Sequence, residues 1–117
     1  TLPGVTQTIV ITRMEGKTPI PEKEHLGVLA AATPTLCIFL SIDKIEEIVK
    51  TLQPHYGKDC PVAVVYKATW PEQKIICAKL SDITEAVKRE AIKKSALIIV
   101  GWMLGKEFTR SVLYSQR

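Results

Sequence analysis

The sequence predicts an α/β fold in which helices pack on a mixed sheet of roughly five strands. Short apolar runs rich in β-branched residues alternate with segments whose apolar residues recur at helical spacing. The run over residues 96–100 is entirely apolar, which is typical of a strand buried on both faces. We therefore place that strand in the middle of the sheet.

The first half of the chain predicts two strands that alternate with two helices. Thr, Ile and Val dominate the first strand, and Leu26, Leu29 and Ala30 would share one face of the next helix. Ser41 stands directly before the second helical pattern, where a side-chain oxygen can cap a helix. The predicted elements are a strand over 7–13, a helix over 23–32, a strand over 35–40 and a helix over 42–52.

The second half predicts three strands and one helix. A short reversal through Pro71 joins the first two strands, so we expect this pair to be antiparallel. Strands that alternate with helices favour parallel pairs elsewhere in the sheet. Ser81 can cap the helix, and Gly101 ends the last strand. The predicted elements are strands over 62–66, 74–79 and 96–100, and a helix from Ser81 to about Ala91.

Composition and charge restrict the classes of function. The chain has 117 residues, 46% of them hydrophobic and 6% aromatic, and its net charge is +4. Because the basic residues are scattered and aromatic residues are few, we expect no nucleic-acid binding. No apolar run reaches membrane-spanning length, so we expect no membrane partner. The spacing of Cys37, Cys60 and Cys77 fits neither a zinc site nor a disulfide framework, which suits a reducing cytoplasm. We expect Cys37 and Cys77 to be buried.

The strand that runs from Pro61 into the segment before Gln73 is the strongest candidate for a binding site. Pro71 prevents this strand from continuing as a central one. Strand ends are where α/β proteins commonly place ligands, and the small side chain of Ala68 would let a flat ligand approach the backbone. An ordinary strand end without a ligand is the plain alternative.

No side chain stands out as catalytic. A nucleophile elbow, a P-loop and a Gly-x-Gly-x-x-Gly motif are all absent from the sequence. His25 and His55 have no acidic or thiol partner at a recognisable spacing. Arg13, at the end of the first strand, could hold a carboxylate through two hydrogen bonds, although a solvated terminal residue explains it as well. We assign no catalytic residue and no metal site, which suits binding by shape and backbone groups.

Three segments together resemble the C-terminal lobe of the tetrapyrrole (corrin/porphyrin) methylases. They are Gln-Thr-Ile-Val-Ile-Thr-Arg at 7–13, Thr-Leu-Cys-Ile-Phe-Leu-Ser at 35–41 and Pro-Val-Ala-Val-Val-Tyr-Lys-Ala-Thr-Trp-Pro-Glu-Gln-Lys at 61–74, with Ala-Leu-Ile-Ile-Val-Gly following at 96–101. The polar part of the third segment is most similar to the branch that methylates C11 of precorrin-4 or cobalt-precorrin-4. So are Thr-Arg-Met-Glu-Gly-Lys-Thr-Pro-Ile-Pro at 12–21 and Ser-Val-Leu-Tyr at 111–114.

The resemblance implies one half of a two-lobed enzyme of cobalamin biosynthesis that uses S-adenosylmethionine and commonly forms dimers. By motif, backbone groups at Leu40 and Ala68 would bind the cofactor, and Gly101 would close its adenine side. Thr12 and Arg13 are candidates for binding the carboxylates of the tetrapyrrole substrate. The family's N-terminal lobe, with its Gly-Asp-Pro-type loop, is absent from this sequence, so we expect this chain alone to be inactive.

Two other interpretations stay open at this point. The chain could belong to a sibling methylase that acts at another tetrapyrrole carbon, or it could be an anion- or nucleotide-binding module without catalysis. The sequence begins Thr-Leu-Pro-Gly-Val without a methionine, so we expect an internal segment of a longer protein. Within it we assign residues 1–105 to the lobe and residues 106–117 to a C-terminal tail.

Overall fold

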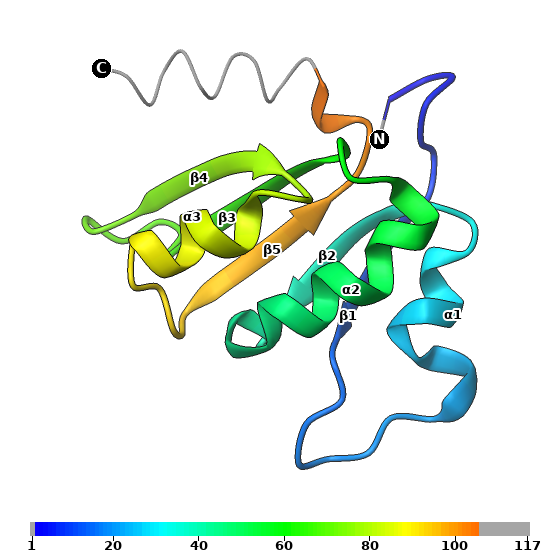
Figure 1. Cartoon of the computed structure of the whole chain (residues 1–117), viewed down its shortest axis with the longest axis horizontal. Coiled ribbons are helices and arrows are strands. Elements are labelled where there is room, and N and C mark those ends of the chain that lie inside the picture. The colour runs from blue at the N-terminus through cyan, green and yellow to red at the C-terminus, as the bar shows by residue number, and fades with distance from the viewer. Residues whose placement is uncertain (1, 106–117) are drawn as a thin grey trace.

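Five strands and three α-helices follow one another along residues 2–105, the part of the chain that this computed structural model describes (Figure 1). The strands are β1 (Ile9–Arg13), β2 (Thr35–Phe39), β3 (Pro61–Tyr66), β4 (Lys74–Lys79) and β5 (Ala96–Val100). The helices are α1 (Leu26–Ala30), α2 (Ile45–Tyr56) and α3 (Ile83–Arg89), with 3₁₀ turns at Glu22–Glu24 and Ile42–Lys44. The tail predicted over 106–117, with its Ser-Val-Leu-Tyr motif, lies outside the described residues.

The strands form one sheet in the order β1-β2-β5-β3-β4, so β5 is central, as its apolar sequence predicts. β1 and β2 run parallel, with Ile9 opposite Thr35. β5 runs antiparallel to both β2 and β3, and β3 runs antiparallel to β4. The predicted mixed, five-stranded sheet is therefore confirmed, with parallel pairing confined to β1 and β2.

All three helices cover the same side of the sheet (Figure 1). Successive residues of a strand face opposite sides, so every second residue of the central strands projects into the core beneath the helices. These strand residues are fully buried in one core cluster with apolar residues of the three helices, and they are Leu36, Ile38, Val62, Val64, Ile98 and Val100.

The other side of the sheet is apolar, and no helix within residues 2–105 covers it. Ile11 on β1 is 72% exposed there, and Phe39 and Ile75 are more than two-fifths exposed. Cys37 and Cys77 are half-buried on this side. The prediction that both cysteines are buried is wrong, because the described helices pack on one side of the sheet and leave these alternate positions open.

Two helices differ in extent from their predictions. Within the segment predicted as one helix over 23–32, His25 adopts an extended backbone (φ −60°, ψ 146°) that separates a 3₁₀ turn from the short α1. α2 continues through Pro54 to Tyr56, past its predicted end. Tyr56 is buried, and its hydroxyl donates a hydrogen bond to the carbonyl of Pro34, which fixes the last turn of α2 against the core.

Neither predicted serine cap forms. α2 is preceded by a 3₁₀ turn and α3 begins after Asp82, and the side chains of Ser41 and Ser81 cap neither helix. The Ser41 hydroxyl instead accepts a hydrogen bond from the Met14 amide and donates one to the Phe39 carbonyl, both at 2.8 Å. This buried hydroxyl ties the end of β1 to the end of β2, so those two ends lie at one edge of the sheet.

Replacing the buried Ser41 with alanine should lower the free energy of unfolding by about 1–3 kcal/mol, because two hydrogen bonds worth about 0.5–1.5 kcal/mol each are lost. Ser81→Ala, at an exposed serine that caps nothing, should change it by less than about 0.5 kcal/mol. Urea denaturation followed by circular dichroism measures both. Equal effects of the two substitutions would show that the Ser41 bridge does not stabilise the fold.

Stability should fall in alkaline solution. Burial raises the pKa of the Cys60 thiol from 9.0 to about 12. The folded state therefore favours the neutral thiol, so this contribution is complete below pH 9 and is lost as the pH rises toward 12. Each pH unit in that window should remove about 1.4 kcal/mol of unfolding free energy. Urea titrations at about pH 8.5 and about pH 10 should show the decline, and Cys60→Ala should reduce it. An unchanged slope in Cys60→Ala would assign the decline to other groups.

Candidate functional site

A cavity of about 400 Å³ opens at the edge of the sheet where β2 and β3 end and β5 begins. Leu40 follows β2 and Ala68 follows β3, and both line this cavity. Its walls are mostly apolar, and its polar residues come from the segment before β5 and from the start of the 3₁₀ turn before α2. The lining residues are Phe39, Leu40, Ile42, Asp43, Val65, Ala68, Lys93, Lys94, Ser95, Ala96 and Leu97.

The start of β5 lines this cavity because β5 runs against both of its neighbours. In the ladder with β3, Leu97 lies opposite Val65 and Ala96 lies opposite Tyr66. The residues from Ser95 to Leu97 therefore meet the C-terminal ends of β2 and β3. Sequence reasoning missed these residues, because it assigned the other end of β5 to the site.

Gly101 lies at that other end, and the structure does not bring it together with Leu40 and Ala68. Its amide donates to the Pro61 carbonyl at 3.3 Å, at the start of β3. A Cβ built on Gly101 would lie 3.3 Å from the Thr35 Oγ1 atom, so close packing against β2 accounts for the glycine here. The assignment of Gly101 to the cofactor stays an untested prediction.

Four non-glycine residues around the cavity have a left-handed backbone, which costs energy and often marks functional sites. They are Leu40, Lys67, Thr69 and Ser95, with φ values of 56°, 48°, 71° and 58°. The Lys67 amide donates to the Ser95 carbonyl at 2.8 Å, which joins the end of β3 to the approach to β5. Leu40 is 87% exposed. Main-chain groups are thus presented at the edge of the sheet.

The turn that carries Ala68 is held by its neighbours on both sides. The ammonium of Lys67 lies 5.4 Å from the centre of the Tyr66 ring and 5.5 Å from that of the Trp70 ring, within the range of cation–π attraction. The Gln73 side chain accepts a hydrogen bond from the Thr69 amide at 2.7 Å. The polar motif that follows β3 therefore builds a defined turn, and Ala68 lies in its middle.

Thr12 and Arg13 end β1 and line a shallow hollow of about 330 Å³ with Phe39 and Leu40. The two predicted substrate residues and the predicted cofactor residue Leu40 are therefore neighbours. One nitrogen of the Arg13 guanidinium donates to the carbonyls of Met14 and Thr18, at 3.4 and 3.3 Å. Arg13 therefore holds the loop after β1 and also lines the hollow.

The site offers shape and backbone groups rather than a tuned acid or base. Burial strongly raises the pKa values of Tyr56 and Cys60, and neither residue lines the cavity. No group of three or more histidine, cysteine or acidic residues within positions 2–105 is arranged to hold a metal ion. None of the described helices has the length and apolar composition needed to cross a bilayer.

Several known proteins with related sequences are C(11)-methyltransferases of precorrin-4 or cobalt-precorrin-4. The chain is 51% identical to the cobalt-precorrin-4 C(11)-methyltransferase of Methanocaldococcus jannaschii over 99% of its length, which is 46% of that protein. It is 45% identical to the precorrin-4 C(11)-methyltransferase of Pseudomonas aeruginosa, over 97% of this chain and 46% of that protein. The chain thus spans about half the length of these relatives.

A solved structure has the same fold, and a family profile matches the chain. The crystal structure of a cobalt-precorrin-4 methyltransferase superimposes with a TM-score of 0.85 at 42% identity, over 89% of this chain and 44% of that one. The profile of the Tetrapyrrole (Corrin/Porphyrin) Methylases matches residues 1–84. The chain therefore belongs to the tetrapyrrole (corrin/porphyrin) methylase family.

Proposed function

We propose that this chain is the C-terminal part of an S-adenosylmethionine-dependent methyltransferase that methylates C11 of precorrin-4 or cobalt-precorrin-4 in cobalamin biosynthesis. The observation that carries the proposal is the single apolar cavity that Leu40 and Ala68 share. The identity to C11-methyltransferases, between 42% and 51% for the M. jannaschii, P. aeruginosa and Priestia megaterium proteins, supports the choice of reaction. A uroporphyrinogen-III C-methyltransferase is 32% identical, which keeps methylation of another tetrapyrrole carbon as the second candidate.

The cavity suits the adenosyl part of the cofactor. Phe39, Val65 and Leu97 give it apolar walls, and the small side chains of Ala68 and Ala96 leave space beside the backbone. The backbone at Leu40 and Ala68, which line the cavity, would supply the hydrogen bonds to the edge of a purine. A uroporphyrin-III C-methyltransferase from Thermus thermophilus, which has the same fold at a TM-score of 0.67, was crystallised with S-adenosylhomocysteine.

The methyl transfer would depend on alignment of the donor with the substrate carbon and on exclusion of water. S-adenosylmethionine supplies a methyl group on a sulfonium, which a nucleophilic ring carbon can attack without a strong base. In the full-length protein the apolar walls of the cavity would exclude water from the donor, and the turn around Ala68 would help to orient it. Thr12 and Arg13 lie beside Leu40, where they would hold a carboxylate of the tetrapyrrole and set the position of its ring.

The complete protein would supply the other wall of this cleft. Because the chain spans about half of its relatives, we expect the isolated chain to be inactive. We also propose a cytoplasmic homodimer for the full-length protein. The apolar side of the sheet, with Ile11, Phe39 and Ile75 exposed, supports further burial of this surface in the assembled enzyme.

Ala68→Trp in the full-length protein should reduce the affinity for S-adenosylhomocysteine at least about a hundredfold, because an indole would fill the cavity. Isothermal titration calorimetry measures this affinity. Ala31→Trp, at an exposed alanine that follows α1, is the matched control and should bind as the wild type does. Wild-type affinity in Ala68→Trp would remove Ala68 from the site.

The full-length protein should bind S-adenosylhomocysteine tightly, whereas this chain alone should bind it weakly or not at all. The isolated chain offers only one side of the proposed cleft, so most of the cofactor would remain in water. Equal affinities would contradict a site shared between two lobes and would favour a self-sufficient nucleotide-binding module. Mass and NMR analysis of the corrinoid product then separates methylation at C11 from methylation at another carbon.

A further inference from the structure

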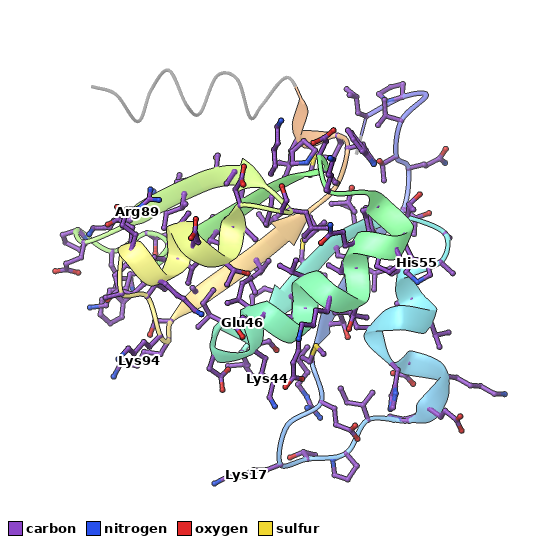
Figure 2. The ribbon with its side chains drawn as sticks, viewed as in Figure 1. Lys17, Lys44, Glu46, His55, Arg89 and Lys94 are labelled. Atoms are coloured by element: carbon purple, nitrogen blue, oxygen red, sulfur yellow. The ribbon has the colours of Figure 1, made fainter. Side chains whose placement is uncertain are left out.

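Basic side chains gather at the edge of the sheet that carries the candidate site. Arg13, Lys17 and Lys44 line a cavity of about 560 Å³ beside the loop after β1. Lys93 and Lys94 line the apolar cavity at the start of β5. Figure 2 shows Lys17, Lys44 and Lys94 on the lower side of the molecule, the side at which β2 ends and β5 begins.

Three lysines elsewhere in the described residues have acidic partners. Lys74 pairs with Glu90 at 3.4 Å and Lys79 with Asp59 at 3.6 Å. Lys88 on α3 pairs with Glu46 on α2. None of the ion pairs found within residues 2–105 includes Lys17, Lys44, Lys93 or Lys94. Lys50 and Lys58 are not in these ion pairs either, so the site lysines differ from them by the cavities that they line.

The basic cavity adjoins the apolar cavity directly. Leu40 and Asp43 line both of them, so a ligand that extends from one cavity can reach the other. Asp43 is the one acidic residue among the described residues that line the basic cavity, and three cationic residues line it as well. Arg13 already donates to two loop carbonyls. Among the described contacts, no hydrogen bond or ion pair engages the ammonium groups of Lys17 and Lys44.

We propose that Lys17 and Lys44 form a subsite for a carboxylate side chain of the tetrapyrrole. This inference rests on the proposed function. The macrocycle carries acetate and propionate groups on its rim, and an ammonium at a fixed place can bind one of them with a charge-assisted hydrogen bond. Occupation of the basic cavity would place the ring over Leu40, next to the apolar cavity that holds the methyl donor. The two lysines thus act as positioning residues.

The test uses the full-length protein with Lys17→Gln/Lys44→Gln. The control is Lys50→Gln/Lys58→Gln, which removes the same charge from α2 and from the turn before β3. The probe is uroporphyrin III, a stable polycarboxylate tetrapyrrole, and its binding is followed by porphyrin fluorescence at two salt concentrations. S-adenosylhomocysteine affinity is measured in the same variants by calorimetry.

The site variant should bind uroporphyrin III about tenfold more weakly than the wild type, with a smaller dependence on salt. Its affinity for S-adenosylhomocysteine should be unchanged, and the control variant should behave as the wild type does. Equal weakening in both variants, or none in the site variant, would overturn the subsite. The subsite would also be overturned if a single-stranded oligonucleotide bound with the same dependence on both lysines. If the wild type binds uroporphyrin III through these lysines but does not bind S-adenosylhomocysteine, the subsite stands and the proposed methyl transfer fails.

Discussion

The direction of β5 is the constraint on which the site depends. Because β5 runs antiparallel to β2 and β3, its first residues meet the ends of both neighbours. Its register is fixed by the core, since a shift of one residue would turn Ile98 and Val100 out of the interior. The same register sets Leu97 opposite Val65, and both line the cavity. The packing of the core therefore determines the walls of the site on the edge of the sheet.

The fixed edge explains how a site without tuned side chains can select a ligand. Left-handed backbone at Leu40, Lys67 and Ser95 is costly, and it persists where surrounding contacts enforce it. The Lys67–Ser95 hydrogen bond and the Ser41 bridge to Met14 supply such contacts on two sides of the cavity. Recognition by main-chain groups needs this rigidity, because a mobile loop would lose conformational entropy when the ligand binds, and this loss would weaken the affinity.

Local sequence patterns predicted all five described strands in their order along the chain. The motif resemblance predicted Leu40 and Ala68 as cofactor residues, and the structure places both in one cavity. What they could not predict depends on long-range packing. Nothing in the apolar run of β5 encodes its direction, so Ser95 was missed, and the structure does not bring Gly101 to the cavity that Leu40 and Ala68 line. The preference of serine for helix caps likewise could not reveal that Ser41 bonds across two strands.

The charge distribution bears on the proposed chemistry as well as on substrate binding. Lys93 and Lys94 line the cavity proposed for a cationic donor, and like charges repel. Affinity for a sulfonium would then have to come from Asp43 in the same cavity, from the apolar walls and from main-chain contacts. Transfer of the methyl group removes the positive charge of the donor, so the repulsion is relieved as the reaction proceeds. Basic residues at this edge would therefore attract the anionic substrate and, at the same time, favour the transition state over the bound, charged cofactor.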